Sequence, residues 1–295
     1  MSIPLRLRDR ALDLEPGKPV LMGILNAAPD SFSDPGGDPP ERLVERGLAL
    51  AADGAAIVDV GGESGRTDRE AVSTAEEADR VVPVIEALAA EGVLVSVDTW
   101  RAEVAREALT AGAAMVNDVS ALSEPDVAAA CAEAGAALVV THTRVPPKHK
   151  GFPDYDDVLD DVEELLAERA SVARECGVAD EQLVFDPGID LAKTPAQSVE
   201  VLRRLPDLTT FGRPLLLAVS RKDFIGALTG RTPAERDGGT LAAVGAAAAA
   251  GASIVRVHDV AGATDYLRVR AALRGEGPVP GELRLDEALR TEPAA

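Results

Sequence analysis

Residues 93–117 read VLVSVDTWRAEVAREALTAGAAMVN, and this stretch contains one complete strand–helix–strand unit. Its first five residues are mostly β-branched, which predicts a short buried strand at 93–97. Residues 102–111 then follow a helical pattern that ends at Gly112, a residue typical of a helix C-terminus. A second apolar run at 114–117 predicts the next strand. A helix that joins two strands in this way indicates that the strands are parallel.

The same unit repeats about eight times along the chain without an internal linker. The predicted strands are at 20–25, 56–60, 93–97, 114–117, 137–140, 183–185, 215–219 and 254–257. The predicted helices include 42–52, 75–90, 102–111, 126–134, 158–176, 198–205 and 241–249. Eight such units favour a closed (β/α)8 TIM barrel over an open doubly wound sheet, which often carries a glycine-rich phosphate loop that this sequence lacks.

We therefore predict the α/β class and a single domain. The barrel and a short N-terminal extension should occupy residues 1–275, and a polar C-terminal tail should occupy residues 276–295. Apolar residues make up 46% of the chain and aromatic residues 3%, so the core must be built from Ala, Val and Leu.

The overall charge limits the classes of partner. The 295 residues carry a net charge of −20, from 50 acidic and 30 basic side chains. Nucleic acids and anionic membranes are polyanions, so this surface would repel both, and we expect neither as a partner. An anionic small-molecule substrate would need a local cluster of positive charge.

Other features of the sequence predict a cytoplasmic protein. The first 20 residues lack the apolar core of a signal peptide, and no run approaches the roughly 18 apolar residues of a membrane span. The two cysteines, Cys131 and Cys176, fall in predicted helices without neighbouring metal ligands. Two reduced thiols are the simplest interpretation.

Polar or ionisable side chains follow every predicted strand. In a barrel these strand ends meet on one face, where the active sites of barrel enzymes lie. In chain order the groups are Asn26, Asp59, Asp98, Asn117, 141–144, Asp186, 220–222 and 256–259. A single aspartate in such a position is usually a helix N-cap, and Asp59 and Asp118 fit that interpretation. Eight successive polar ends instead indicate a functional face.

The chemistry of these groups suits a planar polar ring that carries a phosphate. Asp98 and Asp186 can each accept paired N–H donors from a heterocycle, and Asn117 can both donate and accept. Positive charge is expected after the seventh and eighth strands, where barrels often bind phosphate. It would come from Arg221, Lys222, Arg256 and His258.

Several of these segments resemble, in order and spacing, the signatures of the dihydropteroate synthase family. The segment LMGILNAAPDSFSD at 21–34 is similar to the first signature, and DVGGES at 59–64, followed by Arg66, is similar to the second. The pattern is completed by SVDT at 96–99, VNDV at 116–119, DPG at 186–188, SRK at 220–222 and RVHD at 256–259. The resemblance covers about residues 20–273 and implies a pterin-binding barrel.

That family joins 6-hydroxymethyl-dihydropterin diphosphate to p-aminobenzoate in folate biosynthesis and releases pyrophosphate. The resemblance implies a pterin site made by Asp98, Asn117, Asp186 and Lys222. It implies a diphosphate site made by Asn26, Arg256 and His258, with Asn26 also placing Mg²⁺. It implies an acceptor site made by Arg66, Leu191, Ser220 and Arg221, and a homodimer.

The resemblance also gives the expected catalytic groups, which are Asp34, Asp98 and Lys222. Pyrophosphate would leave as a metal-bound anion. Electrostatic stabilisation of that anion should therefore account for most of the lowering of the activation barrier. The carbon left behind is cationic, and a carboxylate such as Asp98 or Asp34 could stabilise it. The amine of the second substrate then needs no strong base.

The chain departs from the family pattern mainly around the acceptor. Ala28 and Gly65 each stand where the family has threonine, and Thr141-His142-Thr143 replaces Met-His-Met. The family's Gly-Phe-Gly-Lys becomes Asp190-Leu191-Ala192-Lys193, which removes an aromatic ring and two glycines. It also adds a carboxylate near an expected anionic substrate, and like charges within about 4–6 Å would repel.

These departures leave four hypotheses. The first is a working synthase, and the second is a paralogue that binds the pterin diphosphate but uses another amine or condenses poorly. The third is a pterin-binding methyltransferase with a corrinoid partner, which the 29–34 loop and the Ser-Arg-Lys segment disfavour because a methyl donor needs no diphosphate site. The fourth is a pterin-binding protein without catalytic activity.

Overall fold

The computed structural model describes residues 2–28, 38–65, 67 and 70–290. Eight strands form one parallel sheet in the order β8-β7-β6-β5-β4-β3-β10-β9. A parallel bridge between Phe185 and Leu215 joins the two ends of this order and closes the ring. The strands are β3 (Val20–Asn26), β4 (Ala55–Gly61), β5 (Val95–Asp98), β6 (Met115–Asp118), β7 (Ala137–Thr141), β8 (Leu183–Asp186), β9 (Leu216–Ala218) and β10 (Ile254–Val257).

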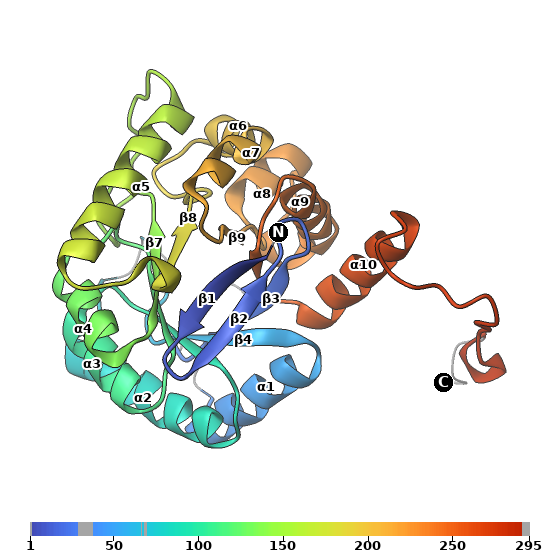
Figure 1. Ribbon diagram of the computed structural model, residues 1–295, viewed down its shortest axis with the longest axis horizontal. Helices are drawn as coiled ribbons and strands as arrows, with labels where there is room; N and C mark the ends of the chain where they lie inside the picture. The colour runs from blue at the N-terminus through green and yellow to red at the C-terminus, as the bar shows by residue number, and fades with distance from the viewer. Residues whose placement is uncertain (1, 29–37, 66, 68–69, 291–295) are drawn as a thin grey trace.

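Helices surround the strands on the outside, so the predicted α/β barrel is confirmed (Figure 1). The helices are α1 (Pro40–Ala52), α2 (Thr74–Ala90), α3 (Ala102–Thr110), α4 (Asp126–Ala134), α5 (Val158–Glu175), α6 (Pro195–Arg203), α7 (Leu205–Leu208), α8 (Asp223–Thr229), α9 (Asp237–Ala249) and α10 (Val260–Leu273). Short 3-10 turns are η1 (Asp180–Gln182), η2 (Thr209–Phe211), η3 (Pro233–Glu235) and η4 (Glu287–Leu289). No helix within the described ranges has the length and apolar character of a membrane span.

The N-terminal extension forms an antiparallel hairpin of β1 (Ile3–Leu7) and β2 (Arg10–Leu14), which we did not predict. Leu5, Leu7 and Leu14 on this hairpin are at most 1% exposed. They pack against side chains from the barrel strands such as Met22 and Ile57, in a cluster separate from the core beneath the helices. The hairpin therefore fills the N-terminal end of the barrel.

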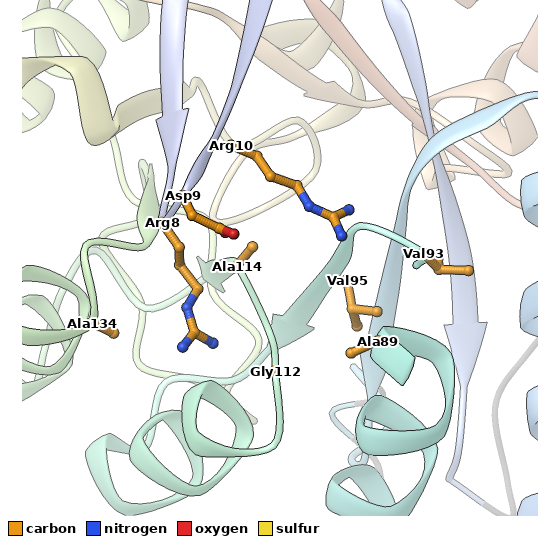
Figure 2. Close-up of a pocket in the computed structure, with 9 residues that line it drawn as sticks. All are labelled: Arg8, Asp9, Arg10, Ala89, Val93, Val95, Gly112, Ala114 and Ala134. Atoms are coloured by element: carbon orange, nitrogen blue, oxygen red, sulfur yellow. The ribbon is translucent and has the colours of Figure 1, made fainter. Parts of the chain in front are cut away.

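A cavity of about 580 Å³ lies beside the turn of this hairpin (Figure 2). Arg8 Nη1 binds the carbonyl oxygen of Leu109 at 2.8 Å, and Arg10 Nη1 binds that of Gly92 at 3.0 Å. These carbonyls belong to the last turn of α3 and to the second residue beyond α2, where cations are favourable. The cavity lies at the amino ends of the strands, away from the predicted functional face, and its arginines anchor the hairpin to the helices.

The chain leaves the barrel after α10. The residues from Gly275 to Arg290 are almost all exposed and extend away from the barrel (Figure 1). Val269 and Leu273 on α10 are 57% and 84% exposed, and further exposed apolar side chains follow in the extended segment. This part of the surface is apolar although the chain as a whole is strongly acidic.

Candidate active site

A polar layer lies above the apolar interior of the barrel, toward the carboxyl ends of the strands. Successive side chains of a strand point to opposite faces, so a residue two positions beyond an inward side chain also points inward. Three apolar residues of the inner cluster are followed in this way by charged or amide residues. The pairs are Ile57 and Asp59, Met115 and Asn117, and Ile254 and Arg256.

Arg256 connects the members of this layer. Its Nε lies 2.6 Å from Asp59 Oδ2, and its Nη2 lies 2.7 Å from Asp98 Oδ2. Asn117 Nδ2 donates to the same Asp59 oxygen at 3.1 Å. Side chains from β4, β5, β6 and β10 thus form one network, which brings together three of the predicted site residues, Asp98, Asn117 and Arg256.

Asp59 was interpreted as a helix N-cap, and that interpretation is wrong. Its side chain is fully buried and pairs with Arg256 inside the barrel. The alternation of side chains along the strand predicts its position, since Asp59 is two residues after the inward Ile57 and so points to the same face. Asp118 accepts the backbone N–H groups of Ser120 (2.8 Å) and Leu122 (3.0 Å), so it holds a turn after β6 rather than the start of a helix.

Burial governs the ionisation of the two predicted ring-binding carboxylates. It raises the pKa of Asp98 to about 7, although the nearby Arg256 guanidinium opposes that shift. Burial also raises the pKa of Asp186, against the stabilising Gly188 N–H (2.7 Å) and the positive charge of Lys222. A carboxylate whose pKa is raised by burial beside a charged partner is typical of a functional site.

Some buried polar atoms of this layer have no partner among the described protein atoms. They include Asp59 Oδ1, Asn117 Oδ1 and Thr141 Oγ1. A buried polar atom without a partner is unfavourable by about 1–3 kcal/mol. These atoms, on β4, β6 and β7, are therefore available to a ligand with a polar edge.

The cationic side of the site differs in one respect from expectation. Ser220 Oγ lies 2.8 Å from His258 Nδ1 and joins the ends of β9 and β10. Burial and the neighbouring cations, Arg256 first among them, lower the pKa of His258 to about 3. This pKa favours the neutral imidazole in the free protein, whereas a positive charge was expected on His258. Arg221 Nε pairs with Asp237 on α9 at 3.0 Å.

The acceptor loop does not present the carboxylate that we expected to repel an anion. Asp190 Oδ1 accepts the Ser198 hydroxyl at 2.9 Å, and Oδ2 accepts the Phe224 N–H at 3.2 Å. Asp190 and Ala192 have φ values of 63° and 54°, the left-handed conformation that favours glycine. The backbone shape that suits the family's two glycines is thus retained, and Leu191 lies half-buried between them.

A second buried cluster was missed by the sequence analysis. Arg101 binds Glu63 Oε2 at 2.8 Å and also contacts Glu77. Lys148, from the loop after β7, donates to the Ser64 carbonyl at 2.8 Å. These contacts fix the loop after β4 beside the polar layer. The spacing of these residues along the chain does not predict that they lie in contact.

Two predicted residues, Asp34 and Arg66, lie outside the described residues, as does the 29–34 segment. Asn26 is half-buried at the end of β3. The described part of the chain contains no cluster of three or more His, Cys, Asp or Glu side chains that could hold a metal ion.

Residues 22–258 match the family model described as "Pterin binding enzyme", and the chain belongs to this family. The chain is 43% identical to the dihydropteroate synthase of Synechocystis over 258 residues, covering 86% of this chain and 89% of that protein. The Xanthomonas albilineans dihydropteroate synthase, solved with 4-aminobenzoic acid, is 42% identical with a TM-score of 0.86, covering 95% of this chain and 100% of that one. The same enzyme in complex with 7,8-dihydropteroate gives a TM-score of 0.82 at 42% identity, over 94% and 100% of the two chains.

Proposed function

We propose that this enzyme condenses 6-hydroxymethyl-dihydropterin diphosphate with p-aminobenzoate and releases pyrophosphate. The observation that carries the proposal is the network of Asp59, Asp98, Asn117 and Arg256 at the carboxyl ends of the strands. Relatives about 40% identical along most of the chain are dihydropteroate synthases, and one of their structures holds 7,8-dihydropteroate.

The pterin ring would lie against the polar layer. Asn117 already donates to Asp59, so its free Oδ1 is oriented to accept an N–H from the ring. Asp186 would accept a further pair of N–H groups, with Lys222 supplying positive charge beside it. The side chains of Asn117 and Asp186 are already held in place by their strands and hydrogen bonds. Binding of the pterin would therefore cost little conformational entropy in these side chains.

The diphosphate would lie toward β3 and β10. His258, neutral and held through Nδ1 by Ser220, would offer its Nε2–H to an oxygen of the diphosphate. Mg²⁺ binds well through one protein oxygen together with substrate phosphates, so the single amide of Asn26 fits this role. Bound Mg²⁺ would neutralise charge on the departing pyrophosphate.

Asp98 and Lys222 are the catalytic groups that the described residues offer. As pyrophosphate leaves, positive charge develops on the methylene carbon, and the Asp98 carboxylate would stabilise it. Arg256 holds that carboxylate at 2.7 Å and favours its charged form. Arg66, Leu191, Ser220 and Arg221 would receive p-aminobenzoate, and Asp34 would act from the first loop.

The loop geometry favours the synthase over a paralogue with a different acceptor. The carboxylate of Asp190 is bound to Ser198 and to the start of α8, so it does not oppose an anionic acceptor. The test is to measure pterin-dependent and acceptor-dependent pyrophosphate release in parallel. Acceptor-dependent release at micromolar p-aminobenzoate supports the synthase, whereas pterin binding without release supports the paralogue or a binding protein.

We further propose a cytoplasmic homodimer. The exposed Val269 and Leu273 lie one turn apart on α10 and form an apolar stripe. A two-fold axis beside α10 would bury this stripe against its own copy, the usual self-complementary arrangement. The cytoplasm would supply both small polar substrates.

A further inference from the structure

Lys193, at the end of the loop after β8, is almost entirely buried. Its side chain is among the largest fully buried ones, and the residue is 1% exposed. Its Nζ lies 2.7 Å from His142 Nδ1, 3.0 Å from the Gly188 carbonyl oxygen and 3.2 Å from the Leu191 carbonyl oxygen. A fully buried lysine is rare unless its ammonium group has partners. The contacts of Lys193 therefore indicate a specific role for this residue.

The three contacts match the three donors of an ammonium group. All three partners are acceptors, provided that His142 carries its proton on Nε2. The Nε2 proton of that tautomer has an acceptor, because His142 Nε2 lies 2.7 Å from Asp161 Oδ1. Asp161 also pairs with Arg144. Burial and the Lys193 charge lower the pKa of His142 to about 4, which keeps this ring neutral. Burial lowers the pKa of Lys193 to about 7. The contacts nevertheless favour the ammonium, because a neutral amine would offer only two donors to three acceptors.

This contact controls the shape of the loop that carries two predicted site residues. Gly188 accepts from Lys193 through its carbonyl and donates its N–H to Asp186 Oδ1, so a single residue connects the two side chains. The Leu191 carbonyl is held directly by the same ammonium. The positive charge of Lys193 also opposes the rise in the pKa of Asp186 that burial causes.

The loop needs such support because its backbone is strained. Asp190 and Ala192 both adopt left-handed φ values, which are unfavourable by about 1–2 kcal/mol for a residue with a side chain. Tyr155 donates to the Ala192 carbonyl at 2.9 Å and supports the loop from its other side. Strained backbone persists only where surrounding contacts fix it.

We propose that Lys193 is a positioning residue for the condensation. Its buried ammonium, bound to His142, fixes the 186–193 loop and thereby sets both the ring-binding Asp186 and the acceptor-side Leu191. This inference rests on the proposed function, and neither Lys193 nor His142 would touch a substrate.

The first test compares K193M with V201A in the full-length enzyme. Val201 is buried on α6 and its aliphatic side chain makes none of these hydrogen bonds, so V201A controls for lost stability. We expect K193M to raise the KM for both substrates at least tenfold and to weaken pterin binding, measured by calorimetry, to a similar degree. V201A should lower the unfolding temperature but keep both KM values within about threefold of wild type.

A second pair of variants tests the contact from the other side. Asparagine can place its Oδ1 where His142 has Nδ1, so H142N should keep KM values within about threefold of wild type. H142L leaves one ammonium donor unpaired and should behave like K193M. Wild-type KM values in folded K193M, or equal effects of H142N and H142L, would overturn the inference. A wild-type protein that neither binds the pterin nor releases pyrophosphate would instead overturn the proposed function.

Discussion

At the scale of single residues, Asp59 holds the polar layer together, because both Arg256 and Asn117 bind the same one of its oxygens. Removing one partner of a buried ion pair leaves the other charge uncompensated, and the usual loss is about 3–5 kcal/mol. Arg256 keeps Asp98 as a second partner, so the loss here should fall at the lower end of that range.

We therefore expect D59N to lower the free energy of unfolding by about 3 kcal/mol, measured by urea denaturation. The exposed D79N is the matched control and should change it by less than about 0.5 kcal/mol. A loss below about 1 kcal/mol in D59N would contradict the role given to this pair.

His258 gives the site a defined pH dependence. Its pKa is about 3 in the folded protein, against about 6.5 in an unfolded chain. Between these values the unfolded chain binds more protons, so the stability contributed by this residue is present above about pH 6.5 and is lost as the pH falls toward 3.

H258N cannot titrate in this range. We therefore compare the free energies of unfolding of the wild type and of H258N. The excess of the wild-type value should fall as the pH is lowered from 6.5, by at most about 1.4 kcal/mol per pH unit. Denaturant unfolding of both proteins at several pH values measures this difference. A difference that stays constant between pH 4 and pH 6 would contradict the assignment of a neutral, buried His258.

At the scale of elements, the loop between β8 and α6 shows how a changed sequence keeps its backbone. Ala192 has the left-handed conformation and a methyl side chain that makes no hydrogen bond, whereas Asp190 has the same conformation and a carboxylate that accepts two hydrogen bonds. The two positions should therefore respond differently to glycine.

A192G should raise the free energy of unfolding by about 0.5–1 kcal/mol, because relief of the left-handed strain exceeds the entropy that glycine adds to the unfolded chain. D190G gains the same relief but loses two hydrogen bonds of about 1 kcal/mol each, so it should be neutral or destabilised. Thermal unfolding of the two variants gives the comparison, and the reverse order of stability would be inconsistent with the contacts of Asp190.

Most elements could be predicted because each strand is a short apolar run followed by a periodic helix. The strand at 254–257 and the helix at 126–134 agree with β10 and α4 at both ends. The β1–β2 hairpin was missed although Leu5, Leu7 and Leu14 alternate with polar residues, because two five-residue strands are weak signals outside the repeat. Helix α8 has only seven residues, too few to show a period.

The site could be predicted only in part, for a physical reason. Asp98, Asn117 and Arg256 were predicted together because the carboxyl ends of parallel strands meet on one face. Which atoms pair there depends on distances across the barrel, so the Asp59–Arg256 pair and the Lys193–His142 contact were not predictable from spacing. The neutral state of His258 likewise depends on burial, which the sequence does not state.

At the scale of the whole molecule, the functional site and the proposed dimer surface use different parts of the barrel. The site lies at the carboxyl ends of the strands, and the apolar stripe lies on the outer helix α10. The net charge of −20 would keep copies apart unless an apolar surface brings them together.

The double variant V269D/L273D should therefore convert the dimer to a monomer, as measured by light scattering during size-exclusion chromatography. Leu228, on α8 and 72% exposed, gives a control, because L228D should leave the mass unchanged. A wild-type mass of one chain would contradict the proposed dimer. An unchanged dimer in V269D/L273D would contradict its placement on α10.

In the proposed function, the polar layer serves the condensation of a pterin diphosphate with p-aminobenzoate. The most direct measurement supplies the purified protein with Mg²⁺ and 6-hydroxymethyl-dihydropterin diphosphate, and follows pyrophosphate and 7,8-dihydropteroate with and without p-aminobenzoate. We predict that both products form in equal amounts and only when the acceptor is present, and that chelation of Mg²⁺ stops the reaction. Tight pterin binding without acceptor-dependent release of pyrophosphate would contradict the proposed function.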